Sequence, residues 1–304
     1  MKITNKHNLP APVVAALSFD SYDRGKSNRS ITQLIDSPKV SILKREHDPE
    51  ISEDVSNKLW SVLGTAVHIM FENSTDDENM ISEERYFFTH PEGWTISGAI
   101  DLQVMDQKSQ SITVMDYKCT SVWSVIFDKK EWHNQLNAYA WLLRKRSIAK
   151  DEVVCDWPVT KLQVVAVLKD WKQNELKRSS GNYPKAPIVI IDIPLWSNEK
   201  QDEYMESRIK LHSDAEFAYL TGQSLPDCSP VEQWAKGAKY AVHKGMAKRA
   251  ARVFDSQKEA NDWVLGQSDS KGLSVVTRQG EKTRCTADWC NVNQWCDQYR
   301  RESV

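Results

Sequence analysis

The sequence predicts an α/β protein with a mixed central sheet that helices flank. Three features of the apolar pattern predict it. Apolar residues recur at helical intervals over 54–72, alternate with polar residues over 94–104, and return to a helical spacing over 128–145. A switch from a period near 3.6 to a period of 2 and back again separates helices from strands. With the further strands described below, the core reads α-β-β-β-α-β in chain order, which is typical of helices packed on a sheet.

Length and composition exclude several classes of protein. The chain has 304 residues, which suits one large or two modest domains. Its 40 Lys and Arg nearly balance 42 Asp and Glu, so it is not a polybasic tail-type binder. With 12 Trp, 9 Tyr and 7 Phe it carries too much apolar surface for a disordered chain. Its longest apolar runs, such as 164–168, are far shorter than the roughly 18 residues that cross a bilayer.

The first eight residues are polar and resemble no secretory signal, so we expect a cytoplasmic protein without a membrane partner. The reducing cytoplasm then argues against a disulfide framework among the six Cys.

The chain is expected to divide into three parts. Residues 1–50 contain Pro10, Pro12, Pro38 and Pro49 and predict an irregular N-terminal arm. Residues 51–222 hold the α/β core, whose first helix is signalled by Ser52 and the acidic residues behind it. Residues 223–304 form a basic, Cys-containing C-terminal extension.

Within the core, the strand at 94–104 and a second strand at 112–116 are joined by a polar link at 106–110. That link is short enough for an antiparallel hairpin. An earlier strand is expected at about 82–88, and two apolar strands at about 162–168 and 187–193 follow the helix at 128–145. A helix at about 199–220 ends the core.

Asp116-Tyr117-Lys118 stands at the end of an apolar strand, where a period of 2 places Asp116 and Lys118 on one face about 7 Å apart. A carboxylate beside an ammonium suits metal-assisted hydrolysis. The triplet alone is a weak signal, because the chain contains five of them and most must be surface charge pairs. The five are Asp106/Lys108, Asp116/Lys118, Asp128/Lys130, Asp170/Lys172 and Asp269/Lys271.

Asp101 distinguishes Asp116 from the other triplets. It lies on the adjoining strand, fifteen residues upstream, and a hairpin can bring the two carboxylates together. Two facing carboxylates repel each other unless a cation lies between them, so the pair predicts a metal site. Asp170/Lys172 also follows an apolar strand, but no carboxylate is placed on a preceding hairpin arm.

An ordered set of motifs carries a family resemblance. Gly64-Thr65-Ala66-Val67-His68 is followed by Gly98-x-x-Asp101, Asp116-x-Lys118 and Gln135-x-x-x-Tyr139. Over about residues 30–195 the set resembles the RecB-like branch of the PD-(D/E)XK nuclease superfamily, especially phage-encoded RecB or lambda-type exonucleases and CRISPR-associated RecB-type nucleases. The resemblance implies a restriction-endonuclease-like core and a metal-dependent deoxyribonuclease, an exonuclease in phage-type DNA recombination, replication or processing. The location would then be the host cytoplasm.

The resemblance also implies roles for single residues. His68, Asp101 and Asp116, with the carbonyl of Tyr117, would bind Mg²⁺ or Mn²⁺, and Lys118 would be the catalytic lysine. Gln135 and Tyr139, four residues apart on one helix face, would help to hold the nucleic-acid strand. Glu83 or Glu84 matches the family's earlier acidic motif, and the choice between them stays open. Other interpretations are a core histidine for His68, a surface position for Asp101, and simple helix packing for Gln135 and Tyr139. Ser30-x-Thr32-x-Leu34 resembles the family's entry motif and is also an ordinary helix N-cap signal.

Three clustered thiols, Cys285, Cys290 and Cys296, have ligand-like spacing, and Cys228 is the sensible fourth. Four thiolates suit zinc or an iron–sulfur cluster equally well, and free thiols are the third possibility. Several RecB-type relatives carry a 4Fe-4S cluster held by one remote and three C-terminal Cys, which this spacing resembles. In those relatives the remote Cys often precedes a Pro near the N-terminus. That position here reads Ser37-Pro38, so Cys228 would have to substitute.

Six cations without an acid fall between residues 236 and 252. They form either a solvated helix face or a set of phosphate contacts. The expected partners are DNA and a recombination or replication protein. The alternative function is a catalytically inactive nucleic-acid-binding or assembly subunit that keeps a metal–thiolate structural site.

Overall fold

The computed structural model describes residues 1–19, 25–74, 77–146, 156–179, 181–287 and 289–302. The chain forms two compact units. The first consists of residues 1–38 and 49–223, and the second of residues 39–48 and 224–304. In the part of the chain so described, no helix is both long enough and apolar enough to span a membrane.

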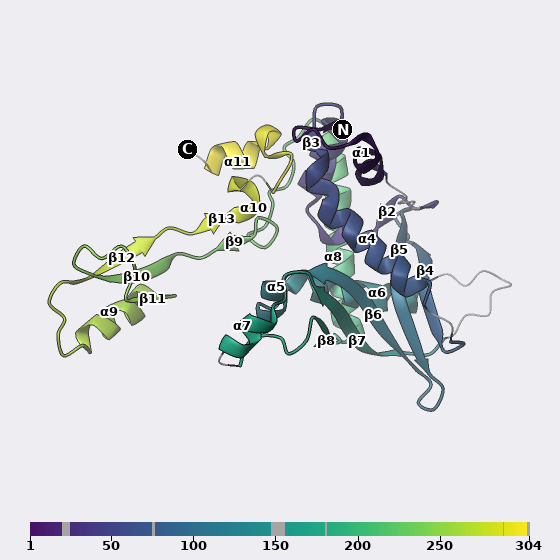
Figure 1. The fold of residues 1–304 in the computed structure, drawn as a ribbon. Coiled ribbons are helices and arrows are strands. Elements are labelled where there is room, and N and C mark those ends of the chain that lie inside the picture. Colours follow the sequence, from purple (N-terminus) through teal and green to yellow (C-terminus); the bar gives the residue numbers. More distant parts are fainter. Residues whose placement is uncertain (20–24, 75–76, 147–155, 180, 288, 303–304) are drawn as a thin grey trace. The chain divides into compact units, whose positions relative to one another are not determined.

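A six-stranded sheet forms the centre of the first unit (Figure 1). Its strands are β2 (Arg29–Ser30), β4 (Met80–Thr89), β5 (Thr95–Asp106), β6 (Ser111–Thr120), β7 (Val159–Leu168) and β8 (Ile188–Ile193). Their order is β2-β5-β6-β7-β8, and β4 also pairs with β5. The β5–β6 and β7–β8 pairs are antiparallel, whereas β6 and β7 are parallel. The predicted α/β class with a mixed sheet is confirmed, as is the hairpin at 106–110.

Helices cover both faces of this sheet. α4 (Leu59–Glu72) contacts β6, and α6 (Lys130–Lys145) contacts the sheet from β4 to β8. They lie on opposite faces, because neighbouring side chains of β6 point to them alternately: Tyr117 packs on Phe71 of α4, and Asp116 bonds Gln135 of α6. α8 (Asn198–Leu220) packs on α6, while α5 (Val122–Ile126) and α7 (Gln173–Arg178) are short connections. The predicted α-β-β-β-α-β order is confirmed.

The prediction of an irregular N-terminal arm is wrong. The described residues among the first 58 form three helices, three short strands and a 3-10 helix. These are β1 (Lys2–Thr4), α1 (Ala11–Ser18), β2, α2 (Ile31–Ile35), α3 (Pro38–Glu46), β3 (Ser52–Asp54) and η1 (Val55–Lys58). Pro10 and Pro12 stand at the start of α1, and Pro38 is the first residue of α3. Proline is favourable there because its missing N–H would have no partner within the helix.

The segment that leads into the sheet is anchored at both ends of α2. Ser30 forms the predicted N-cap, since its hydroxyl accepts from Gln33 N while the Gln33 side chain accepts from Ser30 N. At the other end, Arg208 of α8 donates to Leu34 O at 2.8 Å, and His212 of α8 bonds Asp36 O at 3.1 Å. Burial lowers the pKa of His212 to about 4, so this histidine is neutral and donates from Nε2. α8 therefore satisfies carbonyls that α2 leaves unpaired.

Gly98 of β5 lets the sheet approach its covering helices closely. A Cβ at this position would lie 3.0 Å from side-chain atoms of both Leu142 and Tyr139 in α6, and 3.1 Å from Ile31 in α2. These three side chains are buried in the core of the first unit. Gly98 is therefore required by packing, three residues before Asp101.

The second unit contains a three-stranded sheet in the order β11-β10-β12 and a two-stranded pair of β9 and β13. Its elements are β9 (Ala235–Lys236), β10 (Lys239–Lys244), β11 (Arg252–Phe254), α9 (Gln257–Leu265), β12 (Leu273–Arg278), β13 (Glu281–Lys282), α10 (Thr283–Thr286), η2 (Asn293–Trp295) and α11 (Asp297–Glu302). The helical interpretation of the basic run is wrong, because residues 236–252 lie in strands and turns. Lys239 pairs with Asp255 and Lys244 with Asp269.

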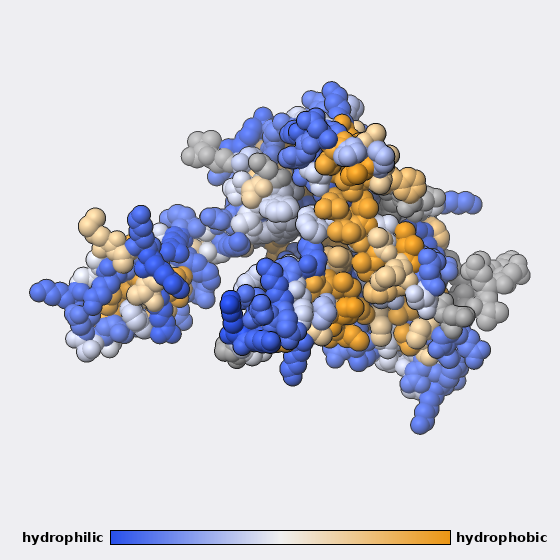
Figure 2. Space-filling view, viewed as in Figure 1, coloured by the Kyte–Doolittle hydropathy of each residue, from blue (hydrophilic) through white to orange (hydrophobic). Residues whose placement is uncertain are grey.

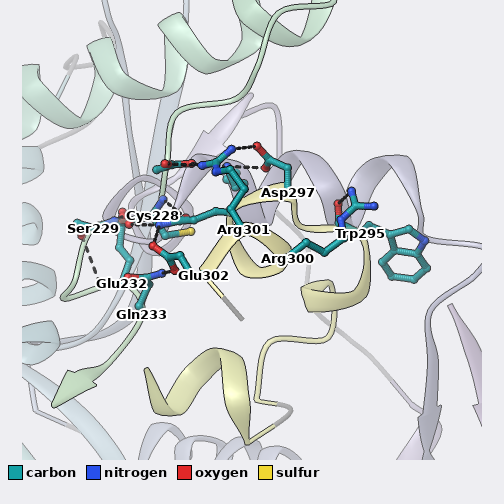
Figure 3. Close-up of polar contacts among 12 residues, drawn as sticks. Cys228, Ser229, Glu232, Gln233, Trp295, Asp297, Arg300, Arg301 and Glu302 are labelled. Atoms are coloured by element: carbon teal, nitrogen blue, oxygen red, sulfur yellow. Dashed lines mark hydrogen bonds and ion pairs between the residues drawn. The ribbon is translucent and has the colours of Figure 1, made fainter. Parts of the chain in front are cut away.

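A buried lysine holds three segments of the second unit together. Lys39, at the start of α3, is fully buried, and its Nζ lies 2.8 Å from both Asp227 Oδ1 and Asp297 Oδ1. Arg301 of α11 donates to the same two carboxylates, and Figure 3 shows it reaching Asp297. The two acids raise the pKa of Lys39 against the opposing effect of burial, so the ammonium stays charged. Loss of one partner would leave a buried charge uncompensated.

We expect Gly98→Val to destabilise the first unit by about 1–3 kcal/mol, because the added methyls overlap three packed side chains. The melting temperature should fall by roughly 2–4 °C per kcal/mol. The matched control is Gly64→Ala in α4, where nothing lies within 4 Å of the added methyl and the helix gains about 0.5–1 kcal/mol. A Gly98→Val protein that melts at or above the wild-type temperature would refute the packing argument.

Candidate active site

The site lies at the point where the two strands of the hairpin, β5 and β6, separate from each other. β5 and β6 pair only between Leu102–Met115 and Asp106–Ser111. Beyond that point β5 continues beside β4, and β6 continues beside β7 as far as Thr120. Asp101 and Asp116 are the first residues past the last pair, one on each strand. We call this point, where β5 and β6 separate next to Asp101 and Asp116, the fork. It brings the two predicted carboxylates together and opens a cavity between their strands.

The cavity at this fork has a volume of about 300 Å³. It is lined by the predicted residues His68, Asp101, Asp116, Lys118, Gln135 and Tyr139. Tyr117 is present through its backbone, because its carbonyl lies 3.1 Å from His68 Nε2. One helix from each face of the sheet and both arms of the hairpin thus contribute to a single site.

His68 enters the cavity from α4. Its Nδ1 lies 3.2 Å from Glu83 Oε1 and 3.7 Å from Asp101 Oδ2. The side chain is 30% exposed, so the alternative of a histidine sealed in the core does not describe it. Burial by itself lowers the pKa of His68, but the hydrogen bond to Glu83 and the charges of Asp101 and Asp116 outweigh it and raise that pKa. The imidazole therefore lies in a strongly negative environment.

Glu83, rather than Glu84, lines the cavity. Glu84 is exposed and pairs in register with Ile100, whereas the regular pairing of β4 with β5 is interrupted at Glu83. Glu83 has a φ of 50°, in the left-handed region that a non-glycine residue enters at a cost of about 1–3 kcal/mol. Such strain is common at functional sites. The alternation of apolar and polar residues along the strand does not predict this backbone conformation of Glu83.

Asp116 is held by α6 and by its own strand. Its Oδ1 accepts a hydrogen bond of 2.9 Å from Gln135 Nε2, which also donates to the Tyr139 hydroxyl at 2.9 Å. Its Oδ2 is buried and lies 2.5 Å from Lys118 Nζ, but no group in the described ranges donates to it in hydrogen-bond geometry. Gln135 and Tyr139 thus orient a carboxylate that has coordination capacity left over.

Asp101 is 6% exposed, and its Oδ2 accepts a hydrogen bond of 2.6 Å from Tyr117 N. Burial and the nearby charge of Asp116 raise the pKa of Asp101 to about 7. A cation bound here would stabilise the ionised form of Asp101.

The donor set fits a hard divalent cation. Among the described residues, one group of His, Cys, Asp and Glu side chains brings its ligand atoms within 4.8 Å of one another, and it consists of His68, Glu83 and Asp101. Carboxylate and carbonyl oxygens suit Mg²⁺ and Mn²⁺, and Mn²⁺ also accepts imidazole. Asp116 stands outside this group because its carboxylate is turned to Lys118 and Gln135.

The other four Asp-x-Lys triplets have structural partners. Asp170 Oδ1 accepts from Val122 N at 2.7 Å, so it caps the start of α5. Asp106 accepts from Lys108 N in the hairpin turn, Asp128 pairs with His133, and Asp269 pairs with Lys244.

A comparison with known families decides the identity of the fold. Residues 40–297 match the profile of the PD-(D/E)XK nuclease superfamily. The chain belongs to this superfamily. No curated protein matches the sequence. Among solved structures, SSO0001 is similar over 66% of this chain and 82% of that chain, with 16% sequence identity and a TM-score of 0.40.

Membership of the PD-(D/E)XK nuclease superfamily implies a nuclease, and metal dependence is usual in it. The mixed sheet with flanking helices is the restriction-endonuclease-like core of this superfamily. In this nuclease the fork between β5 and β6 supplies the acidic residues, and α4 supplies the histidine.

The raised pKa of Asp101 predicts a stability that depends on pH. Above pH 7 the buried carboxylate of Asp101 is ionised, which lowers the free energy of unfolding. This loss becomes smaller as the pH falls from 7 towards 4, because over that range the folded protein binds a proton that the unfolded chain does not yet bind. Asp101→Asn keeps an acceptor for Tyr117 N and removes the charge. In EDTA we expect this variant to melt several degrees above wild type at pH 8, and the gain to shrink at pH 5. With Mn²⁺ present, wild type should melt above Asp101→Asn, because the ion stabilises only wild type. An equal gain at both pH values in differential scanning fluorimetry would contradict the assignment.

Proposed function

We propose that the protein is a divalent-metal-dependent deoxyribonuclease that hydrolyses phosphodiester bonds at DNA ends. The observation that carries the proposal is the fork, where Asp101 and Asp116 meet His68 and Glu83 beside Lys118. Superfamily membership supports hydrolysis of a nucleic acid. The choice of DNA, and of exonuclease action in phage-type recombination, replication or processing, rests on the ordered motifs that resemble RecB-like exonucleases.

His68, Asp101, Asp116 and the Tyr117 carbonyl would hold Mg²⁺ or Mn²⁺, and Glu83 joins this set because its carboxylate lies against His68. When bound, the metal lowers the pKa of a water molecule and offsets charge on the phosphodiester. Tyr117 N fixes the carboxylate of Asp101, and Gln135 fixes that of Asp116. These bonds preorganise the acidic groups before substrate arrives.

Lys118 would assist the nucleophile and stabilise charge that develops in the transition state. Its ammonium lies 2.5 Å from Asp116 Oδ2, and its side chain is 26% exposed, so it faces both the carboxylates and the open cavity. A cation fixed beside the reacting phosphate lowers the barrier most where charge increases during reaction.

The cavity has an open approach. A groove of about 960 Å³ runs along α1 and α4 and shares His68, Glu83, Arg85 and Ala99 with the cavity. A polynucleotide end could enter through this groove, since the proposed metal ligands lie at its edge rather than in a closed interior.

We expect Asp116→Asn to remove at least 99% of Mg²⁺-dependent nucleotide release from linear DNA, because charge stabilisation of this kind is worth roughly 10²–10³ in rate. Lys118→Ala should lose a similar factor. The matched control is Asp106→Asn, which changes the same residue type in another Asp-x-Lys triplet and keeps the turn acceptor. If wild type and Asp116→Asn are equally inert while both bind DNA, the inactive binding or assembly subunit is the correct function.

We also infer that the four predicted thiols of the second unit hold a 4Fe-4S cluster. Cys228, Cys285, Cys290 and Cys296 line one cavity, where Gln298 holds the Cys228 backbone by hydrogen bonds to both its N–H and its carbonyl. Figure 3 shows Cys228 beside the polar residues of this unit. Burial and the charges of Cys290 and Cys296 raise the pKa of the Cys285 thiol.

Within the described residues, the four thiols do not form a ready-made site for a single zinc ion. Zinc–sulfur bonds of about 2.3 Å bring four thiolates within about 4 Å of one another. Within the described ranges, no three of these sulfur atoms all lie within 4.8 Å. A cluster holds its thiolates farther apart, because each of them binds a different iron atom.

Protein purified without oxygen should therefore be brown, with a broad absorption band at the blue end of the visible spectrum and bound iron and sulfide. Cys285→Ser and Cys290→Ser should each lose most of the colour and iron. The matched control is Cys119→Ser, which changes a thiol of β6 in the first unit. A colourless protein that contains zinc would assign zinc instead, and one without either metal would leave free thiols.

A further inference from the structure

We propose that an aromatic patch beside the end of β6 stacks the unpaired bases of single-stranded DNA. The patch consists of Trp60, Trp123 and Phe127 together with Lys169. The inference rests on the proposed function, because it names the form of nucleic acid that the same site would receive.

The three rings of the aromatic patch are more than half exposed. Trp60 is 54% exposed, Trp123 61% and Phe127 64%, whereas Trp141 in the core of the same unit is fully buried. Single exposed apolar residues are common on protein surfaces, but several together near a cavity indicate a binding surface.

Trp123 and Phe127 present a ready-made stack. Trp123 lies on α5 and Phe127 is the residue just after its last turn, with ring centroids 5.9 Å apart and planes inclined by 18°. Other side chains of this helix, such as Val122, pack against the core, which leaves the two rings on the outer side. Nearly parallel rings on a short, anchored helix offer a face to a planar base, and such stacking accepts any base.

Trp60 is the third ring of the aromatic patch, and a cation lies on its face. Lys169 Nζ lies 4.0 Å from the centroid of the Trp60 ring, within the range of a cation–π contact. Lys169 is exposed, so its ammonium can also meet a phosphate that passes the ring.

Hydrogen bonds tie these parts to the catalytic strand. Lys169 N donates to Thr120 O at 3.0 Å, and Asp170 Oδ1 accepts from Val122 N at 2.7 Å. Thr120 is the last residue of β6, two positions after Lys118. Lys169 and the start of α5 are therefore held at the end of the strand that carries Asp116 and Lys118, and Thr120 lies about 7 Å along the backbone from Lys118.

The chemistry of the patch favours a single strand over other occupants. Bases of a duplex stack on one another, so their faces are closed to protein rings, whereas unpaired bases are open. An apolar protein partner would have to bury the Lys169 ammonium, while a phosphate backbone pairs with it. Farther along α4 from Trp60, the exposed apolar side chains Leu63, Ile69 and Met70 belong to the stripe that Figure 2 shows.

The test measures binding in EDTA, so that no hydrolysis occurs. A labelled homothymidine oligonucleotide is compared with an abasic oligonucleotide of the same length and with the corresponding duplex. The double variant Trp123→Ala/Phe127→Ala should bind the base-containing strand at least tenfold more weakly and the abasic strand as wild type does. Trp60→Ala should show the same selectivity with a smaller loss.

Two further variants separate stacking from charge and from general surface effects. Phe217→Ala is the matched control, because Phe217 is 62% exposed but lies on α8, and it should bind like wild type. Lys169→Ala should reduce the slope of log K against log salt by about 0.7, as loss of one single-strand phosphate contact does. Trp123→Phe/Phe127→Tyr should restore binding, which a folding defect in the alanine variant would not explain if both melt alike.

Three results would overturn the proposal. These are unchanged affinity in the double variant, an equal loss on abasic DNA, and a wild-type preference for the duplex. If light scattering shows that the rings hold two copies of the chain together while single-strand affinity is unchanged, the aromatic patch is a protein interface. Because the assay needs no metal, an inactive protein with ring-dependent binding would refute the deoxyribonuclease and keep the patch. An active protein without ring-dependent binding would refute the role of the aromatic patch and keep the deoxyribonuclease.

Discussion

The parting of β5 and β6 is the constraint on which the rest of this structure depends. Past Leu102–Met115, β5 keeps β4 as its partner and β6 keeps β7, so each backbone remains paired while the space between them opens. Asp101 and Asp116 stand at that opening, where their repulsion opposes folding. Hydrogen bonds from Tyr117 N and Gln135 hold the two carboxylates in place. The fold thus carries an electrostatic cost that a cation would offset.

Contacts around the fork hold the strands and helices in place against this electrostatic cost. α4 and α6 press on opposite faces of β6, and α8 holds α2 beside the cavity through Arg208 and His212. Glu83 occupies a left-handed backbone conformation, which aligns its carboxylate with His68. Strain and repulsion therefore concentrate at one place in the first unit, as is usual where binding rather than stability determines the side chains.

The sequence was sufficient for the order of the core elements and for the convergence of Asp101 and Asp116, because a hairpin leaves little choice about which residues face each other. It could not distinguish Glu83 from Glu84, since the difference lies in one backbone angle. Prolines misled the interpretation of residues 1–50, because Pro12 and Pro38 begin helices instead of preventing them. The basic run was ambiguous for a different reason. Its alternating Tyr240 and Val242 belong to β10, but the surrounding lysines hide that period.

We infer that His68, Glu83, Asp101 and Asp116 surround one divalent cation. Anomalous diffraction from a crystal soaked in Mn²⁺ tests it most directly, because the signal locates the ion without reference to activity. We expect a single strong peak at the fork, in contact with His68, Asp101 and the Tyr117 carbonyl, with Lys118 drawn away from Asp116. A Mn²⁺-soaked crystal with no peak there, or with an ion that touches neither Asp101 nor Asp116, would show that these residues do not form a metal site.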